Sequence, residues 1–325
     1  MYTKSVLITG SSGYIGSHFT KYFTQKGYHV FGLDVVEPKK ELRHYLKDFL
    51  HTDIADTPLV LDYLARHKPM GVIHCAAKAL VAESVAFPQM YEDYNVTRAN
   101  AFLETCISSS IANFIFSSTA AVYGEPLHIP IKEDHPRSPV NPYGETKKKF
   151  EDILLKKHHD KEINAGIFRY FNACGADFDA ELGECHEPET HLIPNVIKSI
   201  LEEKPLHIFG NQFSTRDGTC VRDYIHVIDL AHSHYLLMEQ MIQSQMTDNI
   251  FNLGTEGGYS ILEIIDAAQK ILTKKVHFEI KNPRPGDPAT LIASHQKAKT
   301  VLGWEPQWSD LETILTTAWA WHQKQ

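Results

Sequence analysis

Residues 6–16 read VLITGSSGYIG, an apolar β-branched run followed by Gly10, Gly13 and Gly16 at the start of a helical pattern. A tight turn from strand into helix needs glycine for its backbone freedom, and a pyrophosphate that approaches the turn closely leaves no room for a Cβ. The N-terminus of the following helix offers unpaired N–H groups to the anion. The stretch therefore predicts a strand, a dinucleotide-binding turn and a helix, in that order.

Acidic residues follow at the spacing that such a turn requires. Asp34 lies at the end of the next predicted strand, about 20 residues beyond the glycines, where a carboxylate accepts hydrogen bonds from ribose hydroxyls. Because an acid there repels a 2′-phosphate, we expect NAD rather than NADP. Asp53 and Ile54 end the third predicted strand and suit the adenine. The alternative, a glycine loop used only for packing, does not explain why strand, loop, helix and acid come in this order.

The first half of the chain alternates short apolar runs with segments of helical period, which is typical of a parallel sheet covered by helices on both faces. Strands are expected at residues 6–8, 30–33, 72–74, 114–116 and 166–168, and helices at residues 15–26 and 88–108 and from Pro142 onward. We predict an α/β protein with a Rossmann-type doubly wound parallel sheet. Residues 1–173 would form the NAD-binding domain and residues 174–325 a smaller α/β substrate domain, with residues 220–230 returning to the first.

Composition narrows the class of protein. The chain has 325 residues, 43% of them hydrophobic, and a formal net charge of −8, so clustered cations for binding nucleic acid are lacking. No apolar run is long enough to span a bilayer, and we expect a cytoplasmic protein with no membrane partner. The five cysteines are odd in number and never spaced as C-x-x-C, which predicts neither a disulfide nor a zinc site. The cluster of Cys185, His186 and His191 does not offer a closed set of N and S ligands, so no metal is expected.

The catalytic candidates are Tyr143 and Lys147, which lie four residues apart and so project from one face of a helix. A cation within about 4–6 Å lowers the pKa of a tyrosine by roughly one to three units and makes it a usable base. The spacing alone is weak, since Tyr22 and Lys26 share it and are most simply a surface pair. The preceding strand, however, ends in Ser117, Ser118 and Thr119, at the edge where parallel sheets bind ligands.

Longer motifs extend almost from end to end: TGSSGYIGSH at residues 9–18, FIFSSTAAVYGE at 114–125, NPYGETK at 141–147, RYFN at 169–172, HEPETHLIP at 186–194, IFGNQFSTRDGTCVRDYIHV at 208–227 and RPGDPATLIA at 284–293. Together they resemble the UDP-glucose 4-epimerases, which are extended short-chain dehydrogenases/reductases. The first motifs mark the superfamily, and the later ones are specific to the epimerase group.

The resemblance implies an activity and a set of residues. It implies reversible C4 epimerisation of UDP-glucose and UDP-galactose through a 4-keto sugar, with NAD staying bound and with Thr119, Tyr143 and Lys147 as the catalytic triad. It implies a homodimer through residues 88–108 and 142–157. Beside the glycines and acids already named, the implied cofactor contacts are Tyr14, Ile15, Cys75, Ala76, Ala77, Asn95, Tyr143, Lys147 and Phe171. The implied contacts with the UDP-sugar are Thr119, Asn172, His191, Leu192, His207, Phe209, Arg222, Arg284, Asp287 and Leu291.

Two positions depart from the family pattern. The family has a lysine where this chain has Ala79, one place after Lys78, and it often has paired asparagines where this chain has Tyr94 and Asn95. Both departures affect expected NAD contacts and leave the triad intact.

Other activities remain as alternatives. A nucleotide-sugar 4,6-dehydratase needs an acid and a carboxylate after the strand hydroxyl, where this chain has Ala120 and Ala121. A non-catalytic NAD sensor would be expected to lose Tyr143 or Lys147. Within the epimerases, Leu291 lies at the position that resembles the size gate for the C2 substituent. It is smaller than the tyrosine of glucose-restricted members and larger than the serine or cysteine of permissive ones. A UDP-N-acetylglucosamine 4-epimerase, or a bifunctional enzyme, is therefore the main alternative.

Overall fold

The larger part of the molecule is built on a parallel sheet. The computed structural model describes residues 4–284 and 287–325. Seven strands run in the order β10-β6-β5-β4-β1-β2-β3, and all neighbours are parallel. Their bounds are β1 Ser5–Thr9, β2 His29–Asp34, β3 Asp48–His51, β4 Gly71–His74, β5 Asn113–Thr119, β6 Asn164–Tyr170 and β10 Ile250–Leu253. This confirms the doubly wound sheet, whose order reverses between β1 and β4, where ligands bind beyond the carboxyl ends of the strands.

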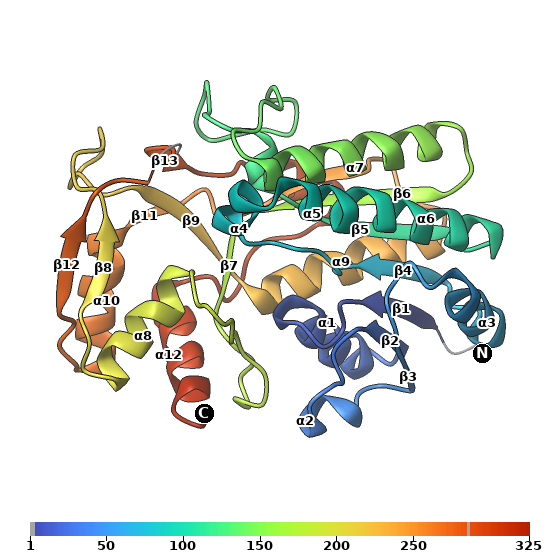
Figure 1. Ribbon diagram of the computed structural model, residues 1–325, viewed down its shortest axis with the longest axis horizontal. Coiled ribbons are helices and arrows are strands. Elements are labelled where there is room, and N and C mark those ends of the chain that lie inside the picture. The colour runs from blue at the N-terminus through green and yellow to red at the C-terminus, as the bar shows by residue number, and fades with distance from the viewer. Residues whose placement is uncertain (1–3, 285–286) are drawn as a thin grey trace.

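Helices cover both faces of this sheet. On one face, α1 packs against α9, and the aromatic and aliphatic side chains of both meet the sheet in one core. On the other face, α3, α6 and α7 form a second core, and α5, α6 and α7 lie together along the sheet in Figure 1. The helices around the large sheet are α1 Tyr14–Gln25, α2 Lys40–Arg43, α3 Thr57–His67, α4 Val81–Ala86, α5 Pro88–Glu92, α6 Ala99–Ser108, α7 Pro142–His159, α9 Val227–Ile242 and α11 Gln296–Leu302.

The expected helices are present, with one difference. The helix predicted at residues 88–108 consists of α5, a π-helical turn η1 (Asp93–Arg98) and α6. Pro142 is in the first turn of α7 as predicted, and the side chain of Asn141 caps this helix by accepting from the Gly144 N–H at 2.9 Å. A π-helical turn leaves no signature in apolar spacing, so the periodicity could not show it.

The smaller part brings short strands and three helices together around a separate core. Figure 1 shows it at the end of the molecule opposite α3. One sheet holds β7 Asn172–Cys174, β9 Val221–His226, β11 Gly258–Ser260 and β13 Thr290–Leu291, and another pairs β8 Leu206–Phe209 with β12 Phe278–Lys281. The helices are α8 Leu192–Leu201, α10 Ile261–Leu272 and α12 Leu311–His322, and a 3₁₀ turn, η2 Ala120–Val122, follows β5.

The chain crosses between the two parts more than once. Strand β9 belongs to the smaller sheet, whereas α9, which follows it directly, packs on α1, and β10 pairs with β6. The segments that return to the large sheet include residues 227–253 and α11, and the predicted domain bounds, with the return at residues 220–230, stay predictions. Over residues 4–284 and 287–325, no helix is both long enough and apolar enough to cross a membrane.

A buried ion pair ties α7 to β6. The guanidinium of Arg169 donates to the carboxylate of Glu151 through Nε at 3.0 Å and Nη2 at 2.8 Å, and the two side chains are 2% and 0% exposed. Arg137 and the Ser118 hydroxyl donate to the same carboxylate. Since both charges are out of water, each depends on the other for its solvation.

We therefore expect Glu151→Ala to lower the free energy of unfolding by about 3–5 kcal/mol, because it leaves Arg169 as an uncompensated buried cation. The matched control is Asp62→Ala, which breaks the exposed pair of Asp62 and Arg66 and should cost less than about 1 kcal/mol. Urea denaturation measures both values, and equal losses in the two variants would contradict this view of the pair.

Candidate active site

The turn between β1 and α1 is closely packed. Gly10 has a φ of +66°, and a Cβ on Gly16 would lie 2.1 Å from the carbonyl oxygen of Gly10. A Cβ on Gly10 would lie 2.8 Å from the backbone nitrogen of Ala76, at the end of β4. Glycine is thus required where the turn meets its own helix and the neighbouring strand.

The same turn leaves polar groups for a ligand. The hydroxyls of Ser11 and Ser12 are buried, yet the described residues offer them no hydrogen-bond partner. Among the described residues, no side chain caps α1 at Gly13, which is exposed, and the first turn of α1 carries no acid. Free donors at a helix N-terminus suit an anion, so the residues present fit the pyrophosphate of a dinucleotide.

The acids that should bind ribose and adenine lie beside this turn. Asp34, at the end of β2, accepts from the backbone N–H groups of Ser12 and Val36, each at 2.9 Å. Burial raises its pKa, against the effect of these N–H donors. Asp53 accepts from Arg98 Nη1 at 2.6 Å, and Ile54 beside it is buried.

Residues after β4 are fixed by Asn95 and by β5. The side chain of Asn95 accepts from the N–H of Lys78 at 2.8 Å and donates to its carbonyl at 2.9 Å, so it holds the loop that follows Cys75, Ala76 and Ala77. Burial raises the pKa of Cys75 to about 12, and its sulfur accepts from the Ser117 hydroxyl. Cys75 is therefore a neutral thiol.

The two departures from the family pattern meet in space. The ammonium of Lys78 lies 5.5 Å from the centre of the Tyr94 ring, and the guanidinium of Arg98 lies 4.0 Å from the same centre. A displaced lysine and an added tyrosine thus form one cation–π cluster. The sequence could not show this contact, because it depends on how the loop is held against η1.

The three catalytic candidates come together at the end of β5. Thr119 is the last residue of that strand, and Tyr143 and Lys147 occupy the first two turns of α7. The Lys147 ammonium donates to the carbonyl of Ser117 at 2.8 Å and lies 4.6 Å from the centre of the Phe116 ring. Tyr143 is half-buried and interacts with the Thr119 side chain.

The pKa shifts of Tyr143 and Lys147 differ from the expectation that the lysine lowers the pKa of the tyrosine. Burial raises the pKa of Tyr143, and the hydrogen bond with Thr119 only partly opposes this. Burial lowers the pKa of Lys147 to about 8, against the nearby Cys75 and Glu151. Burial therefore disfavours both the phenolate of Tyr143 and the ammonium of Lys147.

Ser117 was expected only as one of the hydroxyl residues that end the strand, and it was not among the predicted site residues. Its carbonyl holds Lys147, and its hydroxyl accepts from Tyr170 at 2.8 Å and donates to Cys75. It was visible in the FIFSST run as the residue two before Thr119. Nothing in the run, however, shows that its backbone rather than its side chain holds the lysine.

On the substrate side, the structure brings two pairs together. The guanidinium of Arg284 lies 4.0 Å from the centre of the Phe209 ring, and Arg222 Nη2 lies 3.6 Å from a carboxylate oxygen of Asp287. Leu291, on β13, is in register with Arg222 and packs against the apolar cluster that contains Phe171, which lies between β6 and β7. Pro285 and Gly286 of the same expected motif lie outside the described residues.

The other three predicted substrate residues that bear polar side chains have separate contacts. Asn172 donates to the carbonyl of Asp223 at 2.9 Å, and His207 is half-exposed, 3.8 Å from Glu279. His191 precedes α8 directly, at its N-cap position but without a side-chain capping bond, and its Nδ1 lies 2.7 Å from a carboxylate oxygen of Glu184.

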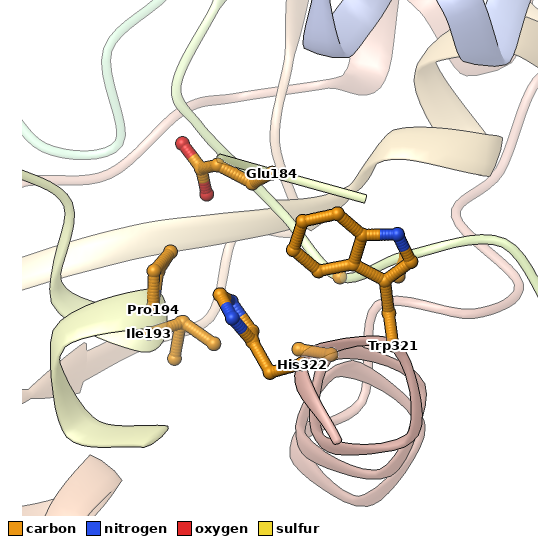
Figure 2. Close-up of a pocket in the computed structure, with 8 residues that line it drawn as sticks. Glu184, Ile193, Pro194, Trp321 and His322 are labelled. Carbon is orange, nitrogen blue, oxygen red and sulfur yellow. The ribbon is translucent and has the colours of Figure 1, made fainter. Parts of the chain in front are cut away.

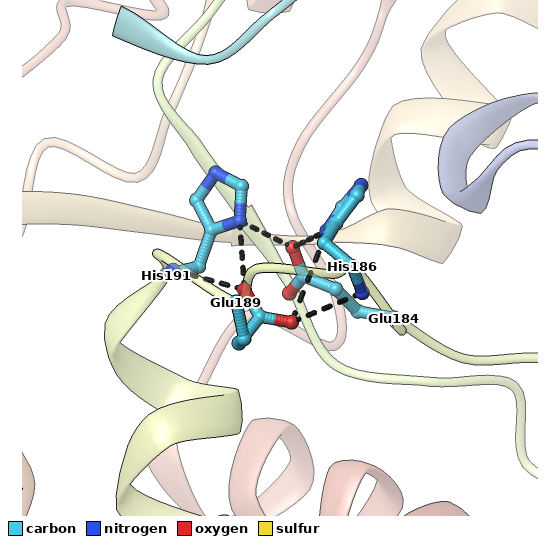
Figure 3. A group of neighbouring side chains, drawn as sticks. All are labelled: Glu184, His186, Glu189 and His191. Atoms are coloured by element: carbon cyan, nitrogen blue, oxygen red, sulfur yellow. Dashed lines mark hydrogen bonds and ion pairs between the residues drawn. The ribbon is translucent and has the colours of Figure 1, made fainter. Parts of the chain in front are cut away.

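The surroundings of His191 are strongly acidic (Figure 3). Burial alone would lower its pKa, but Glu184 and Glu189 accept from it and raise the pKa to about 10. Glu184 also borders a small pocket, shown in Figure 2, lined by Gly175, Ala176, Glu184, Ile193, Pro194, Ala318, Trp321 and His322. The two glutamates were not among the predicted site residues.

Comparison with known proteins places this geometry in a family. The model of the family described as GDP-mannose 4,6 dehydratase matches residues 7–317. A UDP-glucose 4-epimerase of Halalkalibacterium halodurans is 42% identical over 323 residues, which cover 98% of this chain and 96% of that protein. The UDP-glucose 4-epimerase of Lactobacillus helveticus is 41% identical, with 98% and 97% covered.

Solved structures agree with these relatives. The UDP-glucose 4-epimerase of Brucella ovis, in complex with NAD, superposes with a TM-score of 0.93 at 38% identity and covers 97% of each chain. The UDP-Glc/GlcNAc 4-epimerase of Campylobacter jejuni superposes with a TM-score of 0.84 at 33% identity, covering 99% of this chain and 100% of the other. The chain belongs to the UDP-glucose 4-epimerase family, within the extended short-chain dehydrogenases/reductases.

Proposed function

We propose that this protein is an NAD-dependent UDP-glucose 4-epimerase that interconverts UDP-glucose and UDP-galactose through a 4-keto sugar. The observation that carries the proposal is the meeting of Thr119, Tyr143 and Lys147 at the end of β5, one strand removed from the glycine turn across β4. The relatives and structural neighbours that bear the name of this activity support it over almost the whole chain.

The cofactor fits the glycine turn and the acids beside it. We propose that the turn at Gly10, Gly13 and Gly16 holds the pyrophosphate, that Asp34 binds a ribose and that Asp53 and Ile54 border the adenine. When bound there, NAD would supply a hydride acceptor for C4 of the sugar and a donor for its return. The remaining proposed contacts are Tyr14, Ile15, Cys75, Ala76, Ala77, Asn95 and Phe171.

The residues of the chain handle the proton. Tyr143 takes the proton of the sugar 4-hydroxyl and gives it back when the other epimer forms, so the tyrosine ends as it began. The Thr119 hydroxyl bridges the sugar oxygen and the phenol. The Lys147 ammonium, fixed by the Ser117 carbonyl, offers the positive charge that favours the phenolate.

The nucleotide anchors the substrate while the hexose turns. Arg222 and Arg284 carry planar cations suited to a diphosphate, and each already contacts a proposed neighbour, Asp287 and Phe209. Asn172, His191, Leu192 and His207 complete the proposed contacts. Binding through the nucleotide lets the keto sugar present its other face without leaving the site.

Dehydration is the less favoured reaction, although the matching family model is described by that activity. Directly after Thr119 come Ala120 and Ala121, which form the turn η2. Methyl groups cannot protonate a leaving hydroxyl, so the step that distinguishes a dehydratase has no acid at this position.

A second substrate pair is favoured by one observation. Leu291 at the proposed size gate leaves more room than a tyrosine would, and one structural neighbour is named a UDP-Glc/GlcNAc 4-epimerase. We propose side activity on the N-acetylhexosamine pair, with the unsubstituted hexoses as main substrates.

We also propose a cytoplasmic homodimer that pairs through residues 88–108 and 142–157. All five cysteines are free, as expected of a reducing compartment. Val85 and Phe87, just before α5, are 63% and 59% exposed and leave apolar surface beside these helices. Light scattering at micromolar concentration should give twice the mass of the chain, and a monomer at that concentration would contradict the pairing.

Replacing Tyr143 by Phe should lower kcat by about 10²–10⁴-fold, because the hydroxyl that moves the proton is gone while the ring that packs in the site remains. The matched control is Tyr22→Phe, on the other tyrosine–lysine pair of this spacing. The Tyr22 hydroxyl forms a hydrogen bond of 2.8 Å with Nδ1 of His232, on the opposite face of the sheet. The rate of UDP-galactose conversion should change little in the control, and a fully active Tyr143→Phe protein would refute the mechanism.

Leu291→Tyr should suppress conversion of UDP-N-acetylglucosamine and leave UDP-glucose conversion nearly unchanged, since the larger ring fills the space of the C2 substituent. The ratio of kcat/KM for the two sugars measures the effect, and Leu291→Ser should shift it in the opposite direction. If the original protein converts UDP-N-acetylglucosamine as fast as UDP-glucose, the proposed preference is wrong.

A further inference from the structure

A second cluster of chemistry-bearing side chains lies on the loop between β7 and α8. Glu184, His186, Glu189 and His191 each bring a donor atom to within 4.8 Å of the others. Figure 3 shows their carboxylates between the two imidazole rings. No role in moving hydride or proton on the sugar has been given to this group.

The spacing of the donors matches a small coordination sphere. His186 Nδ1 lies 3.3 Å from a Glu184 oxygen and 3.9 Å from a Glu189 oxygen, and His191 Nδ1 lies 2.7 Å and 3.4 Å from oxygens of the same two residues. A tetrahedral ion with bonds of about 2.0–2.2 Å has ligands about 3.3–3.6 Å apart. The two distances to Glu184 are to one oxygen and lie at the edge of that range and below it, and the two to Glu189 are to its two different oxygens.

The burial of the two carboxylates is a second observation on this cluster. The side chains of Glu184 and Glu189 are only 4% and 3% exposed, and the cationic groups within salt-bridge distance of them, among the described residues, are the two imidazoles. His186 Nδ1 is buried and has no hydrogen-bond partner in the part of the chain that the structure describes, although it lies 3.3 Å from a Glu184 oxygen. A buried polar atom without a partner is costly and calls for an explanation.

A neighbouring acidic group shows what a filled cluster looks like. Asp177, Asp179 and Glu181 also lie close enough to hold an ion, but the ammonium of Lys21 donates to all three. A cation is therefore already in place there. The cluster at residues 184–191 has no lysine or arginine in that position among the described residues.

We propose that Glu184, His186, Glu189 and His191 bind one divalent transition-metal ion of the zinc class. Two imidazole nitrogens and two carboxylate oxygens suit Zn²⁺ better than Mg²⁺ or Ca²⁺, which prefer oxygen alone. The ion would fix the loop to the first turn of α8, beside Leu192. No step of the epimerisation passes through the ion, although His191 is also a proposed contact of the UDP-sugar, so metal binding and turnover are measured separately.

A metal site at this loop is contrary to the expectation of no metal in the sequence analysis. That expectation considered Cys185 with the two histidines and found no closed set of ligands. In the structure Cys185 is exposed and lies outside the cluster, and the two glutamates take its place.

The test uses the full-length protein with its affinity tag removed, since a histidine tag would itself bind metal. After dialysis against a chelator, Zn²⁺ is added in competition with a chromophoric chelator, and the metal content of the gel-filtered protein is measured by mass spectrometry. We expect about one Zn²⁺ per chain. Co²⁺ in its place should give the intense visible bands of a tetrahedral site.

His186→Ala and Glu184→Gln should each weaken Zn²⁺ binding about tenfold or more. Cys185→Ser is the matched control on the same loop and should bind like the original protein. His186 is 38% exposed, so its replacement leaves a folded chain, which circular dichroism verifies, even where the Glu184 variant does not fold. Absence of equimolar binding, binding that survives His186→Ala, or binding lost in Cys185→Ser would each overturn the proposal.

Discussion

The contact on which the rest of the site depends is the hydrogen bond from the Lys147 ammonium to the carbonyl of Ser117. It joins the second turn of α7 to the end of β5 and so sets the place of Tyr143 beside Thr119. Because β5 neighbours β4, and β4 neighbours β1, the same edge of the sheet carries the glycine turn. The Ser117 carbonyl thus holds Tyr143 at the same edge of the sheet as the dinucleotide site.

The electrostatics of the site follow from burial. Loss of water raises the pKa of Tyr143 and lowers that of Lys147 to about 8, so the chain alone does not stabilise a phenolate. A bound ligand must therefore supply positive charge near Tyr143. A positively charged nicotinamide ring would favour the phenolate, as a protonated Lys147 would. The base would then be strongest when cofactor and sugar are both in place.

Features that depend on local order were predictable. The glycine turn, the acid at Asp34 and the start of α7 at Pro142 each follow from backbone geometry over a few residues, and the structure contains them. Features that depend on distant contacts were not. The cation–π cluster around Tyr94 and the grouping of Glu184 with His191 require a folded loop, and the π-helical turn has no periodic signature. The roles of the substrate residues also depend on distant contacts, so they stay predictions.

The central claim is that Tyr143 exchanges only the hydroxyl proton, while the hydrogen on C4 leaves and returns as hydride within one site. Conversion of UDP-galactose in D₂O, by protein purified without added NAD, tests it directly by mass spectrometry and proton NMR of the UDP-glucose formed. If the hydride leaves and returns within one site, turnover should place no deuterium on C4. Deuterium at C4 would show that the carbon loses a proton to solvent, and would rule out hydride transfer within one site.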